Sequence, residues 1–73
     1  MPSADEVKTR IEDAIPGAEA AVQTADEVHF SATVRATAFD GLSRLQQHRL
    51  VLDVFSDELG GSIHALSLKT EVP

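Results

Sequence analysis

The stretch VHFSATVRA, residues 28–36, decides the fold because its polarity alternates with a period of two. Apolar and polar residues fall on opposite faces, as in a strand of a sheet that is covered on one side. The apolar set is Val28, Phe30, Ala32, Val34 and Ala36, and the polar set is His29, Ser31, Thr33 and Arg35. The sequence therefore predicts a half-buried strand, and the other elements are placed around it.

The residues before this strand predict a helix and a second strand. A capping-box pattern at Ser3 and Glu6 indicates a helix start, and apolar residues then recur at helical spacing over residues 4–14. The Pro-Gly pair at residues 16–17 ends this helix. A weaker alternating segment, residues 18–24, predicts a strand that is joined to residues 28–36 by a short acidic turn.

After the central strand the pattern becomes helical from Ser43 and then returns to a strand over residues 62–69. The expected apolar stripe of the helix is Leu45, Leu52, Phe55 and Leu59, with Val51 beside it. The pair Gly60 and Gly61 provides the expected helix stop.

The order helix, strand, strand, helix, strand predicts an α+β fold in a single domain, residues 1–73. Strands joined by a short turn should be antiparallel, and strands joined through a helix should be parallel. We expect a three-stranded mixed sheet with both helices on one face.

The composition excludes several kinds of chemical site. The 73 residues include no cysteine, so disulfides, thiolate metal sites and thiol nucleophiles are excluded. The formal net charge of -6 opposes nonspecific binding to nucleic acid or to an anionic membrane. The polar N-terminus lacks the features of a signal peptide, and we expect a cytoplasmic protein. The acidic composition would also suit a salt-rich cytoplasm.

Two histidines lie near the starts of the second and third strands, which this topology places at the same end of the sheet. His29 is near the start of the second strand and His64 is near the start of the third. Adjacent strands lie about 4.8 Å apart, so the two imidazoles could share one metal ligand site. From spacing alone, a histidine at a strand end is more often a hydrogen-bonded surface residue than a ligand. His48 lies roughly 16 Å from the helix end near His64 and is not expected to join them.

A modest basic patch is expected on the second helix, from Arg44, His48 and Arg49. It could contact a partner or nucleic acid, or it could be a solvated helix face. No segment has the spacing of a nucleophile site or of a glycine-rich phosphate loop, so we do not expect an enzyme.

Three spaced elements together resemble the BolA-like family. They are Phe39 with Gly41, the pair His48-Arg49, and the run Ile63-His64-Ala65-Leu66, and the VHF at residues 28–30 also resembles the family's second strand. The resemblance implies an α-β-β-α-β fold similar to class II KH domains, to which some members add a helical turn near TAFDG.

The resemblance also implies a function. BolA-like proteins are partners of monothiol glutaredoxins, with which they share a [2Fe–2S] cluster in iron–sulfur cluster trafficking or iron homeostasis. The glutaredoxin and glutathione contribute thiolates, and the family's strand-three histidine, here His64, is the matching ligand. No cluster is expected to bind tightly to the isolated protein, which should be a monomer or a weak dimer.

This sequence departs from the family pattern at the second ligand. Many members place a histidine or cysteine in the loop between the first two strands, whereas this short loop holds neither. Asp26 or His29 remains as the second contact. Gln47 replaces the first arginine of the commoner Arg-His-Arg, and Leu52 replaces an aromatic residue.

Two other functions stay open. Some BolA-like proteins are DNA-binding transcriptional regulators, and a local basic set made by Arg35, Arg44, Arg49 and Lys69 could serve that role. The Gly-x-x-Gly loop of KH domains is absent, and the net charge is unfavourable. The third alternative is a metal-free protein-interaction module.

Overall fold

The computed structural model describes residues 3–26, 28–57 and 65–73 and shows an α+β fold. The elements in chain order are α1 (Ala4–Ala14), β1 (Glu19–Thr24), β2 (His29–Arg35), the single 3₁₀ turn η1 (Thr37–Phe39), α2 (Arg44–Val54) and β3 (Ala65–Glu71). The predicted order is confirmed, including the added helical turn in TAFDG.

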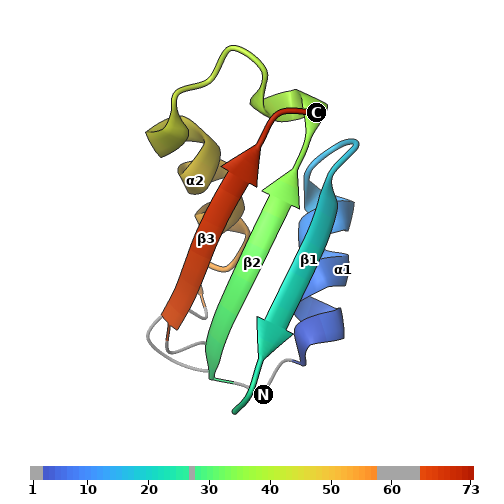
Figure 1. Cartoon of the computed structure of the whole chain (residues 1–73), viewed down its shortest axis with the longest axis vertical. Helices are drawn as coiled ribbons and strands as arrows, with labels where there is room; N and C mark the ends of the chain where they lie inside the picture. Colours follow the sequence, from blue (N-terminus) through green and yellow to red (C-terminus); the bar gives the residue numbers. More distant parts are fainter. Residues whose placement is uncertain (1–2, 27, 58–64) are drawn as a thin grey trace.

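The sheet has the order β1-β2-β3, with β2 in the centre (Figure 1). β1 pairs with β2 antiparallel, and β2 pairs with β3 parallel, as the sequence predicts. In the parallel ladder His29 lies opposite Ala65 and Arg35 lies opposite Glu71. The starts of β2 and β3 therefore lie at the same end of the sheet.

Both helices cover one face of the sheet (Figure 1). The buried apolar residues between these layers are Val7, Ile11, Ile15, Ala20, Phe30, Ala32, Val34, Ala36, Phe39, Val51 and Phe55. The alternation predicted for β2 is confirmed, because Phe30, Ala32 and Val34 point into this core. The polar residues of the strand lie on the open face.

α1 has the bounds that the sequence predicts. The hydroxyl of Ser3 accepts a hydrogen bond from the backbone N–H of Glu6 at 3.2 Å, which satisfies a free donor at the helix start. After the helix, Gly17 has φ +72°, a left-handed conformation that favours glycine. This residue reverses the chain into β1.

Glu12 fastens α1 to β1. Its Oε2 accepts hydrogen bonds from Nζ of Lys8 at 3.0 Å and from the backbone N–H of Ala20 at 3.1 Å. These two donors, Lys8 first, hold the pKa of Glu12 below its usual range. The ionised carboxylate therefore stabilises the contact between the helix and the edge strand.

α2 begins with a complete capping box, in which Ser43 accepts from the N–H of Gln46 and the Gln46 side chain accepts from the N–H of Ser43. It ends at Val54, earlier than the predicted stop at residues 60–61, because Phe55 bonds back to Leu52 in a tighter turn. Leu59, Gly60 and Gly61 lie outside the described residues.

The predicted apolar stripe of α2 is wrong at Leu45, which is 62% exposed. The prediction is confirmed at Phe55 and Val51, which are buried, while Leu52 is only half-buried. Gln47 is one turn before Val51 and is half-buried on the same face. The inner face of α2 thus includes a half-buried polar residue that is not part of the predicted apolar stripe.

Gln47 joins three elements of the fold. Its Nε2 donates to the backbone oxygens of Leu42 at 3.0 Å and Phe39 at 3.4 Å, which follow and end η1. Its Oε1 accepts from the hydroxyl of Thr70 in β3 at 2.6 Å. The side chain therefore holds the η1 segment and β3 against α2.

β3 runs over Ala65–Glu71, whereas the sequence predicts residues 62–69. The strand continues at its C-terminal end because Arg35 pairs with Glu71 and the N–H of Ala36 donates to the Glu71 oxygen at 3.2 Å. Residues 62–64 lie outside the described residues. No helix in the described ranges is long and apolar enough to cross a membrane.

Candidate functional site

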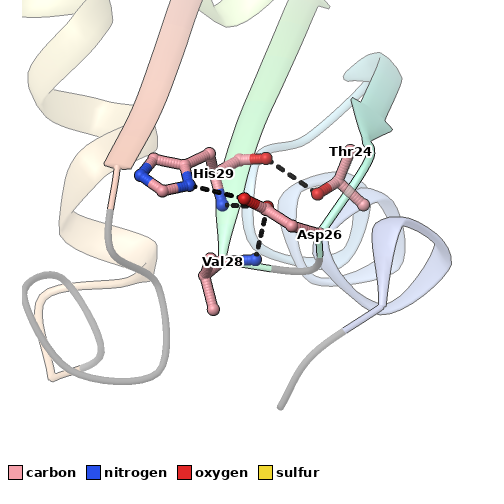
Figure 2. Close-up of polar contacts among 4 residues, drawn as sticks. All are labelled: Thr24, Asp26, Val28 and His29. Carbon is pink, nitrogen blue, oxygen red and sulfur yellow. Dashed lines mark hydrogen bonds and ion pairs between the residues drawn. The ribbon is translucent and has the colours of Figure 1, made fainter.

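Asp26 organises the turn between β1 and β2. Its Oδ1 accepts hydrogen bonds from the backbone N–H groups of Val28 at 3.1 Å and His29 at 2.9 Å (Figure 2). The hydroxyl of Thr24, at the end of β1, donates to the backbone oxygen of His29 at 2.7 Å. Side chains on both sides of the turn therefore fix the backbone that carries His29.

The same carboxylate contacts the imidazole of His29. Oδ2 of Asp26 lies 2.7 Å from Nδ1 of His29, and both side chains are about half exposed. The backbone N–H of His29, its imidazole and the N–H of Val28 hold the pKa of Asp26 well below its usual range. Asp26 is therefore ionised at neutral pH, and each of its oxygens accepts a hydrogen bond.

His29 lies on the open face of the sheet, beside the start of β3. The ring extends from β2 toward the side on which β3 begins (Figure 2), and Ala65 is its partner in the ladder. A surface hollow of about 440 Å³ borders the ring, and its other lining residues include Gln23, Ser31 and Ser67. The small side chains of Ser31 and Ser67 leave space in front of the sheet at this end.

His64 precedes Ala65 in the chain and lies outside the described residues. Its assignment as a cluster ligand therefore stays a prediction. The arrangement on which that prediction depends is confirmed, because the starts of β2 and β3 are neighbours in the parallel ladder. Of the two predicted histidine ligands, the structure places His29.

The described residues do not bring a complete ligand set together. Within residues 3–26, 28–57 and 65–73, no group of three or more histidine, cysteine, aspartate or glutamate side chains is arranged to hold a metal ion. At the start of β2 the described residues place one imidazole, that of His29, in contact with the carboxylate of Asp26.

The predicted basic patch is partly brought together. Arg44 and His48 of α2 line a hollow of about 310 Å³ with Lys69 and Thr70 of β3, and Arg49 is not among its lining residues. At 100° per residue, Arg49 lies on another side of the helix from Arg44, whereas His48 lies one turn from it. The residue that joins Arg44 and His48 in this hollow is therefore Lys69, whereas the sequence predicts Arg49.

The remaining basic residues are separated from one another. Arg35 lines a different hollow, together with the acidic residues Glu19 and Glu71. Along β3, Lys69 lies four residues beyond Ala65, or about 13 Å, so the His48 hollow is distinct from the His29 end of the sheet. The expectation that His48 is not a co-ligand of His64 stays a prediction, because His64 lies outside the described residues.

Comparison with protein families gives one match that covers almost the whole chain. The family model described as BolA-like protein matches residues 6–73. A solved structure of a bolA protein homologue from Coxiella burnetii is similar over 100% of this chain and 94% of its own, with a TM-score of 0.85 and 34% identity. The fold and the sequence therefore point to the same family.

Two curated relatives differ in what their names say: one is named for the family, and the other is named as a DNA-binding regulator. BolA-like protein 1 from Homo sapiens is 45% identical over 53 residues, which are 73% of this chain and 39% of that protein. The DNA-binding transcriptional regulator BolA from Vibrio cholerae is 43% identical over 49 residues, 67% of this chain and 46% of that protein. The matched part spans less than half the length of each.

Proposed function

Because the chain belongs to the BolA-like protein family, we propose that it is a non-enzymatic partner of a monothiol glutaredoxin in iron–sulfur cluster trafficking. The [2Fe–2S] cluster is shared cargo, held between this protein, the glutaredoxin and glutathione. This chain supplies imidazole, with His64 as the first ligand and His29 as the second. The oriented His29 at the start of β2 is the observation that carries the proposal.

The donor set of the chain fits a shared cluster. Histidine can replace cysteine on one iron of a [2Fe–2S] centre, and a chain without cysteine has only nitrogen and oxygen ligands to offer. The His29 side chain is 58% exposed, so a second protein can reach it without moving the core. The thiolates that the chain lacks come from the glutaredoxin and glutathione.

The test is anaerobic reconstitution with a monothiol glutaredoxin, glutathione, iron and sulfide. Visible absorption and circular dichroism are recorded for the wild type and for His64→Ala and His29→Ala, with His48→Ala as the matched control. We expect a spectrum distinct from that of the glutaredoxin alone, altered by the first two substitutions and unchanged by the third. An unchanged glutaredoxin spectrum, with no complex on size exclusion, would refute the proposal.

The hollow between α2 and β3 supports a second candidate function, DNA binding. Arg44 and Lys69 line one concave surface together with His48, so a phosphate would meet two cationic side chains there. Nζ of Lys69 also lies 3.6 Å from Oε1 of Glu71. The Vibrio cholerae relative is named as a DNA-binding regulator. These cations give a net acidic chain one local surface for a polyanion.

DNA binding is tested by fluorescence anisotropy with a labelled duplex over a range of salt concentrations. An Arg44→Ala/Lys69→Ala double variant should lower the slope of log affinity against log salt by about 2, because each lost phosphate contact removes about 0.9. Arg35→Ala is the control, since Arg35 lies among acidic residues away from this hollow. Absence of binding by the wild type at low salt would eliminate this candidate.

A further inference from the structure

The contact between Asp26 and His29 assigns each residue a different role in the proposed site. We infer that Asp26 is a positioning residue that keeps the neutral His29 ring protonated at Nδ1, so that Nε2 is the nitrogen offered to iron. The ligand part of this inference rests on the proposed function. The tautomer part concerns the protein alone and can be tested without a cluster.

The identity of the protonated nitrogen follows from hydrogen-bond chemistry. A neutral imidazole has one N–H donor and one acceptor nitrogen, whereas an ionised carboxylate can only accept. Because Oδ2 of Asp26 lies 2.7 Å from Nδ1 of His29, Nδ1 must carry the proton of this bond. The lone pair of the neutral ring is then on Nε2.

The carboxylate is itself held in place. Oδ1 of Asp26 accepts from the N–H groups of Val28 and His29, so the group that orients the ring is tied to the backbone that carries the ring. Binding of iron by Oδ2 would compete with the short bond to Nδ1. The geometry therefore favours Asp26 as the orienting group and His29 as the ligand.

This arrangement has a known consequence for metal affinity. A ligating histidine that donates its other N–H to a carboxylate has a fixed ring orientation and a more basic ligand nitrogen. Removal of such a partner typically weakens metal binding by about 10–100-fold. Asp26 should therefore influence cluster stability without contacting the cluster.

The tautomer is measured on the free protein by long-range ¹H–¹⁵N correlation spectroscopy of ¹⁵N-histidine, at alkaline pH where the ring is neutral. We expect the wild-type His29 ring to be protonated mainly at Nδ1. In Asp26→Asn the amide keeps an oxygen for the backbone N–H groups but presents an NH₂ donor to Nδ1, which favours protonation at Nε2. Asp53→Asn, at an exposed position in α2, is the matched control.

A wild-type ring protonated mainly at Nε2 would overturn the inference, and this result needs no variant. An Asp26→Asn ring that keeps the wild-type tautomer would also overturn it, provided that amide shifts outside the turn show an intact fold. A switch in Asp26→Asn alone would support it.

Cluster binding tests the ligand part. In the glutaredoxin complex, Asp26→Asn should accelerate cluster loss by about 10–100-fold, in the same direction as His29→Ala, while Asp53→Asn leaves it unchanged. A complex that tolerates His29→Ala, or one that loses its cluster in His29→Ala but not in Asp26→Asn, would overturn the ligand part. If the wild type forms no shared cluster, the proposed function and the ligand part fail together, and the spectrum of the free protein still decides the tautomer.

Discussion

Substitution of Gln47 by alanine should destabilise the protein more than any other polar-to-alanine change in α2. The side chain makes two short hydrogen bonds, to Leu42 at 3.0 Å and from Thr70 at 2.6 Å, and one long contact to Phe39 at 3.4 Å. All three are partly buried. Alanine would release η1 and β3 from the helix at the same time.

The magnitude follows from these contacts. A typical hydrogen bond contributes about 0.5–1.5 kcal/mol net, and a buried partner left without a bond costs about 1–3 kcal/mol. Two good bonds and one weak contact give a loss of roughly 2–3 kcal/mol. A domain of this length has a stability of about 4–11 kcal/mol, so the substitution should lower Tm by roughly 10–20 °C.

Urea unfolding followed by far-UV circular dichroism measures this loss, with thermal unfolding as a second probe. Arg49→Ala is the matched control, because Arg49 is exposed on the same helix and should change stability by no more than about 0.5 kcal/mol. A double-mutant cycle with Thr70→Val should show a coupling of about 1 kcal/mol. A Gln47→Ala loss equal to that of the control, or additive behaviour in the cycle, would refute the reasoning.

Three further predictions concern the core, a turn and the response to acid. Phe39→Ala should cost about 3–5 kcal/mol in urea unfolding, since the ring is fully buried, and a loss below 1 kcal/mol would contradict this placement. Gly17→Ala should cost about 1–2 kcal/mol, because φ is +72° and the new Cβ would lie 3.2 Å from Oγ1 of Thr37; an unchanged midpoint would argue against that strain. The pKa values of Asp26 and Glu12 in the folded protein lie below the usual values of these carboxyl groups, so the unfolded chain binds more protons in acid. The stability that these two carboxylates contribute should therefore be fully present above about pH 5 and be lost as the pH falls through their pKa values in the folded protein. The loss should be smaller in Glu12→Gln. Urea midpoints that stay constant between pH 2 and pH 6 would contradict the lowered pKa values.

Local signals predicted most of the fold. The N-cap at Ser3 and the turn at Gly17 bound α1, and the alternation of residues 28–36 identifies the central strand and its buried face. These features depend on neighbours in the sequence. α2 is different, because its inner face includes Gln47, whose amide is satisfied by η1 and β3. A periodicity of apolar residues cannot identify a half-buried polar residue whose hydrogen-bond partners lie in other elements.

The sequence predicts which residues belong to the candidate site, but it does not predict how their side chains contact one another. The sequence leaves Asp26 and His29 as alternative second contacts, whereas the structure shows that their side chains are in hydrogen-bond contact with each other. The signal available in the sequence was an aspartate three residues before a histidine in a short turn. The basic surface shows the same limit, because strand register brings Lys69 to Arg44 and helix geometry takes Arg49 away.

The most direct test of the shared-cluster account is detection of this protein's own histidine nitrogen on the iron. The glutaredoxin complex is assembled with ¹⁵N-histidine in this chain alone, reduced with dithionite, and examined by pulsed electron paramagnetic resonance. The account predicts a strong ¹⁵N hyperfine coupling that is lost or changed in His64→Ala and retained in His48→Ala. A complex with an intact cluster and no strong ¹⁵N coupling would contradict it, since this protein would then bind the glutaredoxin without ligating the cluster.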